Sequence, residues 1–483
     1  MPKPKKGGNR SRLGDGQIGY RNGVNETCDP LDGMPIALAV RSFDSIALAP
    51  LLERALSERV RAQRATVSDI RIEKSTGEAF TGGRSTPVYF VTCFVSRVGR
   101  VSGEGHRRRG FVVKLVPVPG NASDPRVRRL RESYAVERRF YAQVAPRMRD
   151  EGGPPAPRLL ASDDLEGSGP QPAVCFLLTD LREQGFPRHP DFLSPSEAAR
   201  ALRWCAAMHA QFWGEGKTSS TRFALGWRDH LWDRGGYWTI DGSGSDKGGD
   251  PIDRSAVASQ WSQTVRWAQS RRPDVITTAT AGLGRRIAAA SGAVASYLAN
   301  EARGARGTLI HGDFKAANLF FAAVDGEGRE ESPGDGISRR EGVKVEESAC
   351  VVGAASVAAL DFQFAGRGAG AEDVAYLLFP DAKGHYFEEE GALLKAYHEE
   401  LVNCLIFRGK GGPSTLSFQE FELQYNLSRL DFLRHLLSRG WVGSTDGDAL
   451  LLKATEEKID KLDGGEALAN EAEYTRRILR LIN

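Results

Sequence analysis

Residues 309–321, L-I-H-G-D-F-K-A-A-N-L-F-F, place a short polar loop between two apolar flanks. Within the loop an acidic residue, Asp313, and an amide, Asn318, stand five positions apart. A surface loop with one capped turn is the simplest interpretation of such a pair. The apolar flanks argue against it, because they indicate short strands that anchor the loop inside a packed region.

The spacing of these two residues matches the D-x-x-x-x-N pattern of kinase catalytic loops. In that loop the aspartate accepts the proton of the attacking hydroxyl, and the asparagine binds a magnesium ion on the nucleotide phosphates. We therefore predict that Asp313 is a catalytic base and that Asn318 is a metal ligand.

A second carboxylate, Asp361, ends the apolar run V-A-A-L at residues 357–360. Magnesium prefers carboxylate oxygen, and kinases place such an aspartate at a strand terminus that faces the phosphates. The structural alternative is an ordinary strand-end residue in a turn. Because Asp361 follows the loop motif, we predict that it is the second metal ligand.

A lysine and a glutamate upstream are predicted to hold the nucleotide. Lys114 interrupts the apolar strand F-V-V-K-L-V, and a lysine in that position needs solvent or a buried anion. Glu137 lies on the apolar face of a predicted amphipathic helix over residues 126–148. We expect the two to pair and to orient the α- and β-phosphates. In the alternative, Lys114 lies on an edge strand and Glu137 pairs with Arg138.

Two further segments are candidates for nucleotide contacts. Residues 74–88 carry glycines 77, 82 and 83 and could cover the phosphates, although they match G-x-G-x-x-G poorly and an ordinary hairpin turn fits as well. Residues 173–181 indicate a strand followed by a polar break, where Thr179, Asp180 and Leu181 would present backbone groups to adenine. A plain strand and turn is the alternative here.

These motifs together resemble the aminoglycoside phosphotransferase and choline kinase-like superfamily, and most closely its ecdysteroid kinase-like (CHK) branch. The resemblance rests on H-G-D-F-K-A-A-N, L-D-F-Q and E-D-V-A-Y-L-L, with support from V-E-R-R-F-Y and M-H-A-Q-F-W, and it covers residues 65–435. It implies a bilobal α+β protein kinase-like fold, ATP and Mg²⁺ as cofactors, and a small-molecule alcohol as acceptor. It also implies that His311 buttresses the loop and that Asp373 caps or pairs within the following helix.

The chain departs from this pattern in two insertions. Asp313 and Asp361 are 48 residues apart, and residues 325–350 between them are rich in charge and glycine, which indicates a solvated tip. Residues 235–250 contain G-S-G-S-D-K-G-G-D and are also predicted to be disordered. Neither insertion removes a motif residue.

Composition fits a large enzyme without a membrane span. Of the 483 residues 41% are hydrophobic, and no stretch approaches the roughly 20 apolar residues that a span requires. The net charge of +3 is too small to indicate nucleic acid. Cys93, Cys175 and Cys205 lie in apolar surroundings and are expected to be buried thiols, which favours a reducing, cytoplasmic location. The basic N-terminus leaves a nuclear or organellar signal as an alternative.

We divide the chain into a disordered basic tail (1–35), an N-lobe with a leading helix (36–180) and a mainly helical C-lobe (181–483). The helices outside the site are expected at residues 42–64, 194–214, 255–271, 282–303, 391–407, 417–439 and 448–461. Seven of the eight tryptophans fall between 204 and 267, and we interpret them as core rather than as a cation-binding wall. Asp431, Arg434 and His435 on the late helix could face the substrate pocket or solvent, and we favour the solvated surface.

Substrate identity remains open among choline, a sterol, an aminoglycoside and a sugar-like alcohol. Two other classes are alternatives. A protein kinase should show D-F-G and a long activation segment, whereas this chain has D-F-Q and only a short helical stretch at residues 364–380. A non-catalytic nucleotide-binding scaffold should have lost one of the five site groups, and all five are present.

Overall fold

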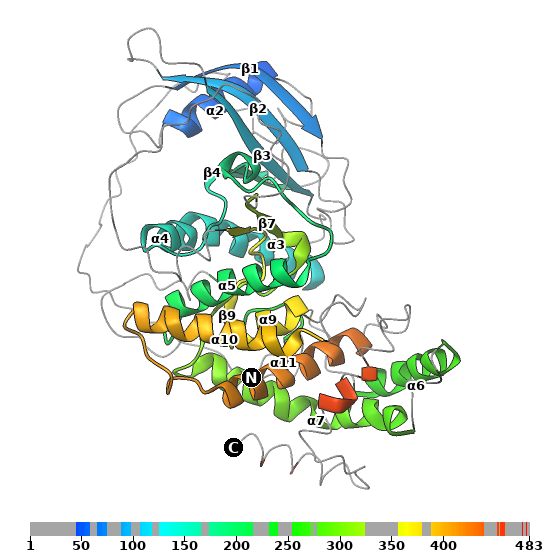
Figure 1. Ribbon diagram of the computed structural model, residues 1–483. Coiled ribbons are helices and arrows are strands. Elements are labelled where there is room, and N and C mark those ends of the chain that lie inside the picture. Colours follow the sequence, from blue (N-terminus) through cyan, green and yellow to red (C-terminus); the bar gives the residue numbers. More distant parts are fainter. Residues whose placement is uncertain are drawn as a thin grey trace, which may run out of the picture.

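The computed structural model has an antiparallel sheet at one end and stacked helices at the other (Figure 1). It describes residues 45–57, 65–74, 88–97, 107–117, 125–165, 173–215, 231–239, 254–271, 273, 278–323, 356–378, 388–438, 452–453, 455–458, 476 and 480. The α+β fold with a β-rich N-lobe and a helical C-lobe is therefore confirmed.

The N-lobe sheet is built from β1 (Ala65–Lys74), β2 (Val88–Arg97), β3 (Arg107–Pro117), β4 (Leu159–Leu165) and β5 (Ala173–Thr179). These strands lie in the order β1-β2-β3-β5-β4, and every neighbouring pair is antiparallel. Lys114 on β3 is opposite Val88 on one side and Phe176 on the other. The edge-strand alternative for this lysine is therefore wrong. Helix α2 (Ser45–Ser57) packs its leucines against the sheet.

One long helical segment connects β3 to β4 and confirms the helix predicted over residues 126–148. It consists of α3 (Pro125–Arg139), a π-helical turn (Phe140–Val144) and α4 (Ala145–Asp150). A π-turn inserts one residue into the helical repeat. Phe140 and Tyr141 of this turn are both buried, with their ring centroids 3.7 and 5.8 Å from that of Phe362.

The C-lobe contains the remaining helices and two short antiparallel strand pairs. Its helices are α5 (Pro195–Phe212), α6 (Arg254–Arg271), α7 (Thr278–Arg303), α9 (Gly370–Leu378), α10 (Glu390–Phe407) and α11 (Phe418–Ser438). Strand β6 (Thr308–Ile310) pairs with β9 (Gly366–Gly368), and β7 (Leu319–Phe321) pairs with β8 (Val357–Ala359). The predicted C-lobe helices match within a few residues, and the described part of the last one, residues 452–453 and 455–458, is helical.

The largest hydrophobic core passes from the N-lobe into the C-lobe. Phe176 of the sheet, Phe140 of the π-turn and Trp204 of α5 belong to one buried cluster with Phe314 and Phe362. Trp204, Trp213, Trp238 and Trp261 are all buried, so the interpretation of tryptophans as core holds for these four. No helix in the described ranges has the length and apolar character needed to cross a bilayer.

Two sequence-based expectations are wrong. Asp431, Arg434 and His435 are each only 3% exposed, because α11 packs against α6, α7 and α9 and has no free polar face there. Residues 235–239 are ordered and packed, with Trp238 1% exposed, so the predicted disordered segment began too early. Residues 240–250 and 325–350, most of the 74–88 loop and the 1–35 tail lie outside the described residues.

The three cysteines predicted to be buried thiols, Cys93, Cys175 and Cys205, are buried and form no disulfide bond.

We predict that Ser194→Ala lowers the free energy of unfolding by about 1 kcal/mol. Ser194 begins α5 with a capping box: its hydroxyl accepts from the Glu197 backbone N–H (3.3 Å), and the Glu197 carboxylate accepts from the Ser194 N–H (2.9 Å). Urea denaturation measures the change. Ser296→Ala is the control, because this exposed mid-helix hydroxyl bonds only to the Gly292 carbonyl. Equal effects of the two substitutions would contradict the capping role.

Candidate active site

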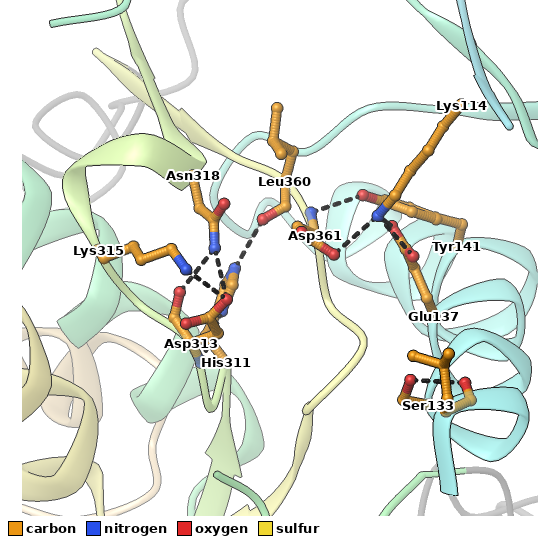
Figure 2. Close-up of polar contacts among 11 residues, drawn as sticks. Lys114, Ser133, Glu137, Tyr141, His311, Asp313, Lys315, Asn318, Leu360 and Asp361 are labelled. Atoms are coloured by element: carbon orange, nitrogen blue, oxygen red, sulfur yellow. Dashed lines mark hydrogen bonds and ion pairs between the residues drawn. The ribbon is translucent and has the colours of Figure 1, made fainter. Parts of the chain in front are cut away.

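The loop between β6 and β7 holds Asp313 and Asn318 against each other (Figure 2). The Asn318 Nδ2 atom donates to the Asp313 carbonyl oxygen at 2.8 Å and to its carboxylate Oδ2 at 3.1 Å. Lys315 Nζ lies 3.1 Å from the same Oδ2 atom. Because the amide nitrogen of Asn318 is used on Asp313, its amide oxygen is the group that remains for a cation.

Asp373, on the first turn of α9, fixes the start of this loop. Its carboxylate accepts from the backbone N–H groups of His311 (2.6 Å) and Gly312 (2.9 Å), and it lies 3.2 Å from His209 Nε2. The expectation that Asp373 pairs within its own helix is therefore wrong. Its three partners come from the loop and from α5, so it holds those two segments together.

Cys205, His209 and Asp373 are close enough to share a metal ion, and all three are buried. His209 Nδ1, however, is 2.7 Å from the Tyr397 hydroxyl, and Asp373 already accepts from the loop. The cluster is accounted for as a buried hydrogen-bond network.

His311 buttresses the loop, as expected. Burial lowers the pKa of His311, so the ring is neutral and has one donor and one acceptor nitrogen. Nε2 donates to the Leu360 carbonyl at 3.0 Å, and Nδ1 accepts from the Asp313 N–H at 3.3 Å. The ring thus connects the Asp313 loop to the residue before Asp361.

Lys114 forms ion pairs with two carboxylates (Figure 2). Its Nζ lies 2.9 and 3.0 Å from the Glu137 oxygens and 2.8 Å from Asp361 Oδ1. The alternative pairing of Glu137 with Arg138 is thereby excluded. Burial opposes a charge on Lys114, but Asp361 and Glu137 raise its pKa well above the usual range.

The pKa values of the two carboxylates around Lys114 are shifted in opposite directions. Burial raises the pKa of Glu137 to about 7, although Lys114 pulls it down. At Asp361 burial acts in the same direction, but Lys114 overcomes it and holds the pKa below its usual value. A buried glutamate and a partly buried aspartate share this one lysine, and such a group of acidic side chains suits a divalent cation.

Asp361 is positioned by the β7–β8 pairing. Leu319 of β7 is opposite Ala359 of β8, and one step further the Leu360 N–H donates to the Asn318 carbonyl at 3.0 Å. Asn318 and Asp361 therefore lie at the same end of this strand pair. Asp361 has φ +69°, and its N–H donates to the Tyr141 hydroxyl at 3.0 Å.

The predicted hinge residues lie at the end of β5, and the structure does not bring them to Lys114. The Thr179 N–H donates to the Arg158 carbonyl (3.0 Å), and the Asp180 N–H donates to the Gly110 carbonyl (3.4 Å). The Asp180 carboxylate pairs with Arg182. Two of the three candidates therefore already use their backbone donors within the N-lobe.

Sequence reasoning missed three aromatic hydroxyls at the site, those of Tyr141, Tyr237 and Tyr376. Tyr376 donates to Asp313 Oδ1 at 2.9 Å, and its oxygen is 3.1 Å from that of Tyr237. The available signal was Tyr376 in the wholly apolar V-A-Y-L-L stretch of α9, because a buried tyrosine hydroxyl requires a partner.

We predict that Gly312→Ala disrupts the loop. Gly312 has φ +79°, and a Cβ atom there would lie 2.2 Å from the Phe364 carbonyl oxygen and 2.6 Å from the Gly236 nitrogen. The matched control is Gly409→Ala, where φ is +63° and no atom lies within 4 Å. The control should lose about 1–2 kcal/mol of unfolding free energy, the backbone cost alone. Urea denaturation should show a clearly larger loss for Gly312→Ala, and equal losses would contradict the steric argument.

Comparison with known proteins identifies one family model. The model described as "Phosphotransferase enzyme family" matches residues 76–329. No curated protein matches the chain.

Several solved structures resemble the chain at low identity. An aminopropanol kinase associated with a microcompartment is 14% identical, with 89% of this chain and 99% of that chain covered and a TM-score of 0.35. An amicoumacin kinase solved with AMP-PNP and Ca²⁺ is 10% identical, with 85% and 87% covered and a TM-score of 0.33. An aminoglycoside phosphotransferase from Streptomyces rimosus is 14% identical, with 74% and 92% covered and a TM-score of 0.32.

Proposed function

The chain belongs to the phosphotransferase enzyme family, whose model spans 254 of its 483 residues, and we propose that this small-molecule kinase moves the γ-phosphoryl group of ATP to an alcohol. One observation carries the proposal: five groups from four segments of the chain lie near one another. They are Lys114 of β3, Glu137 of α3, Asp313 and Asn318 of one loop, and Asp361 after β8. A scaffold protein has no need to keep all five.

Asp313 is the proposed base. The acceptor hydroxyl would donate its proton to this carboxylate as the oxygen attacks phosphorus. Asn318 and Lys315 both contact Oδ2, so the carboxylate is held in one orientation before the acceptor arrives. The positive charge of Lys315 next to it also suits the charge on the transferring phosphoryl group.

Asn318 and Asp361 are the proposed magnesium ligands. An amide oxygen and a carboxylate are hard donors of the kind that magnesium prefers, and both belong to the same end of the β7–β8 pair. Asn318 and Asp361 would hold the ion, whose positive charge would offset the negative charge that develops on the transferring phosphoryl group. Lys114, which is paired with Glu137 and Asp361, would contact the nucleotide phosphates.

The adenine is proposed to bind beside the end of β5. Leu181 is the hinge residue that we favour, since the N–H groups of Thr179 and Asp180 are used in the sheet. We retain the lobe boundary at residues 180 and 181 as part of this proposal, with the N-lobe over 36–180, the C-lobe over 181–483 and the tail over 1–35.

The acceptor is proposed to be a small-molecule alcohol such as choline, a steroid or an aminoglycoside. Within the family we place the chain closest to the CHK branch, on the basis of H-G-D-F-K-A-A-N, L-D-F-Q and E-D-V-A-Y-L-L.

A protein kinase is disfavoured, because Phe362 is followed by Gln363 and α9 begins at Gly370, which leaves no room for an activation segment. The cytoplasmic location stays a prediction.

We predict that Asp313→Asn lowers kcat by about 10²- to 10⁴-fold, the usual contribution of a general base. The amide keeps the shape of the side chain but cannot take the proton. The measurement is ATP consumption with magnesium across a panel of hydroxylated compounds, together with the nucleotide-dependent rise in melting temperature. That rise should persist in the variant.

Asp150→Asn is the control for the loss of one carboxylate, because Asp150 is an exposed residue on α4. It should leave turnover unchanged. Full turnover in Asp313→Asn would refute the assignment of the base.

We predict that Asp361→Asn removes the magnesium-dependent part of ATP binding. The magnesium concentration that gives half of the extra thermal stabilisation should rise about tenfold or more. A tenfold rise corresponds to a loss of about 1.4 kcal/mol in the free energy of magnesium binding. The matched control is Glu390→Gln, which alters a mostly buried carboxylate paired with Arg429 in the C-lobe. An unchanged magnesium requirement in Asp361→Asn would exclude Asp361 as a ligand.

A further inference from the structure

The carboxylate of Asp313 is held on both of its oxygens by different parts of the C-lobe. Oδ2 contacts Asn318 and Lys315 from its own loop. Oδ1 accepts a hydrogen bond of 2.9 Å from the hydroxyl of Tyr376, which belongs to α9. A carboxylate has about four lone-pair sites, so Oδ1 keeps one for the incoming acceptor hydroxyl.

The ring of Tyr376 is fixed by packing. It is stacked on Trp238, with ring centroids 4.6 Å apart and planes 21° apart, and the edge of Phe432 meets it at 4.9 Å and 89°. The residue is 4% exposed. The hydroxyl therefore points at Asp313 without any freedom to swing toward solvent.

The hydroxyl of Tyr376 has that of a second tyrosine, Tyr237, as its neighbour. The Tyr237 hydroxyl is 3.1 Å from that of Tyr376, and since Tyr376 uses its proton on Asp313, Tyr237 is the donor between them. Burial raises the pKa of both phenols, so both keep their protons. Tyr237 is only partly buried, and its carbonyl accepts from Arg129 of α3 at 3.2 Å.

We propose that Tyr376 is a positioning residue for Asp313 and that Tyr237 orients Tyr376, so that the two phenols set the rotation of the base. This inference rests on the proposed phosphoryl transfer. Tyr376 would act by keeping one lone pair of Oδ1 aimed at the acceptor hydroxyl. A small rotation of the carboxylate would misalign the proton transfer while leaving the groups around Lys114 in place.

A purely structural role for Tyr376 predicts a different outcome. A buried tyrosine hydroxyl needs a partner, and loss of that bond would lower stability without a selective effect on turnover. Tyr425 is the matched control for this possibility. It is fully buried, and its hydroxyl donates to the Glu390 carboxylate at 2.6 Å, in the same way that Tyr376 donates to Asp313.

The test compares Tyr376→Phe, Tyr237→Phe and Tyr425→Phe with the wild type and Asp313→Asn. The full-length chain is given ATP and magnesium, first with water as the acceptor and then with the most active alcohol of the panel. We expect Tyr376→Phe to lower kcat about 10- to 100-fold with the KM for ATP changed less than about twofold. Tyr237→Phe should show a smaller loss in kcat, and Tyr425→Phe none, with similar melting temperatures for all three.

A double variant separates positioning from general damage. In the Asp313→Asn background, Tyr376→Phe should cause no further loss, because the hydroxyl acts only through that carboxylate. An additive loss would overturn the proposal.

The remaining outcomes separate the two levels of inference. A Tyr376→Phe enzyme with wild-type kcat, alongside an inactive Asp313→Asn, would refute the positioning role and leave the proposed function standing. Full turnover in Asp313→Asn would refute the assignment of the base and with it the role of Tyr376. A wild type with neither turnover nor a nucleotide-dependent rise in melting temperature would refute the proposed function.

Discussion

The two ion pairs of Lys114 connect the three parts of the chain from which the site is assembled. The lysine comes from an interior strand of the sheet, Glu137 comes from α3, and Asp361 lies 247 residues away after β8. Buried charges are costly unless each is paired, so the sheet, the helix and the C-lobe strand pair must approach together for any of the three to be stable. Because Asp361 pairs with Lys114, the proposed metal ligand is held next to the proposed nucleotide-binding lysine.

Aromatic packing fixes the position of the Lys114 ion pairs relative to the loop that carries Asp313. Phe362, next to Asp361, is stacked on Phe140 of the π-turn and lies 4.4 Å from His311 by ring centroids. Trp204 of α5 is stacked on Phe314, next to Asp313. The residue after each proposed catalytic or metal-binding aspartate is therefore an anchor in the common core, and each carboxylate is carried on a rigid base.

Local patterns were sufficient to single out the five groups that we propose for the site. Asp313 and Asn318 share one short motif, Asp361 ends an apolar run, and Lys114 and Glu137 each interrupt an apolar face, so each was visible within a few residues of sequence. The partners that come from elsewhere in the fold were not visible. Tyr376 finds Asp313 63 positions away, and Asp373 binds the His311 N–H 62 positions away, through packing that sequence spacing does not encode. Asp431 and Arg434 were misplaced for the same reason, because polar residues that pair with each other inside a bundle look the same in sequence as polar residues in water.

The backbone conformation of Asp361 limits which residue types can occupy this position. Its φ of +69° lies in the left-handed region, which glycine, asparagine and aspartate enter most readily. Lys114 limits the choice further, since only an acid at this position forms the second ion pair of its ammonium group. Glycine fits the conformation without the charge, and glutamate supplies the charge with a poorer fit to the conformation. Aspartate alone meets both demands, so almost every substitution of Asp361 should be harmful, whichever acceptor the enzyme uses.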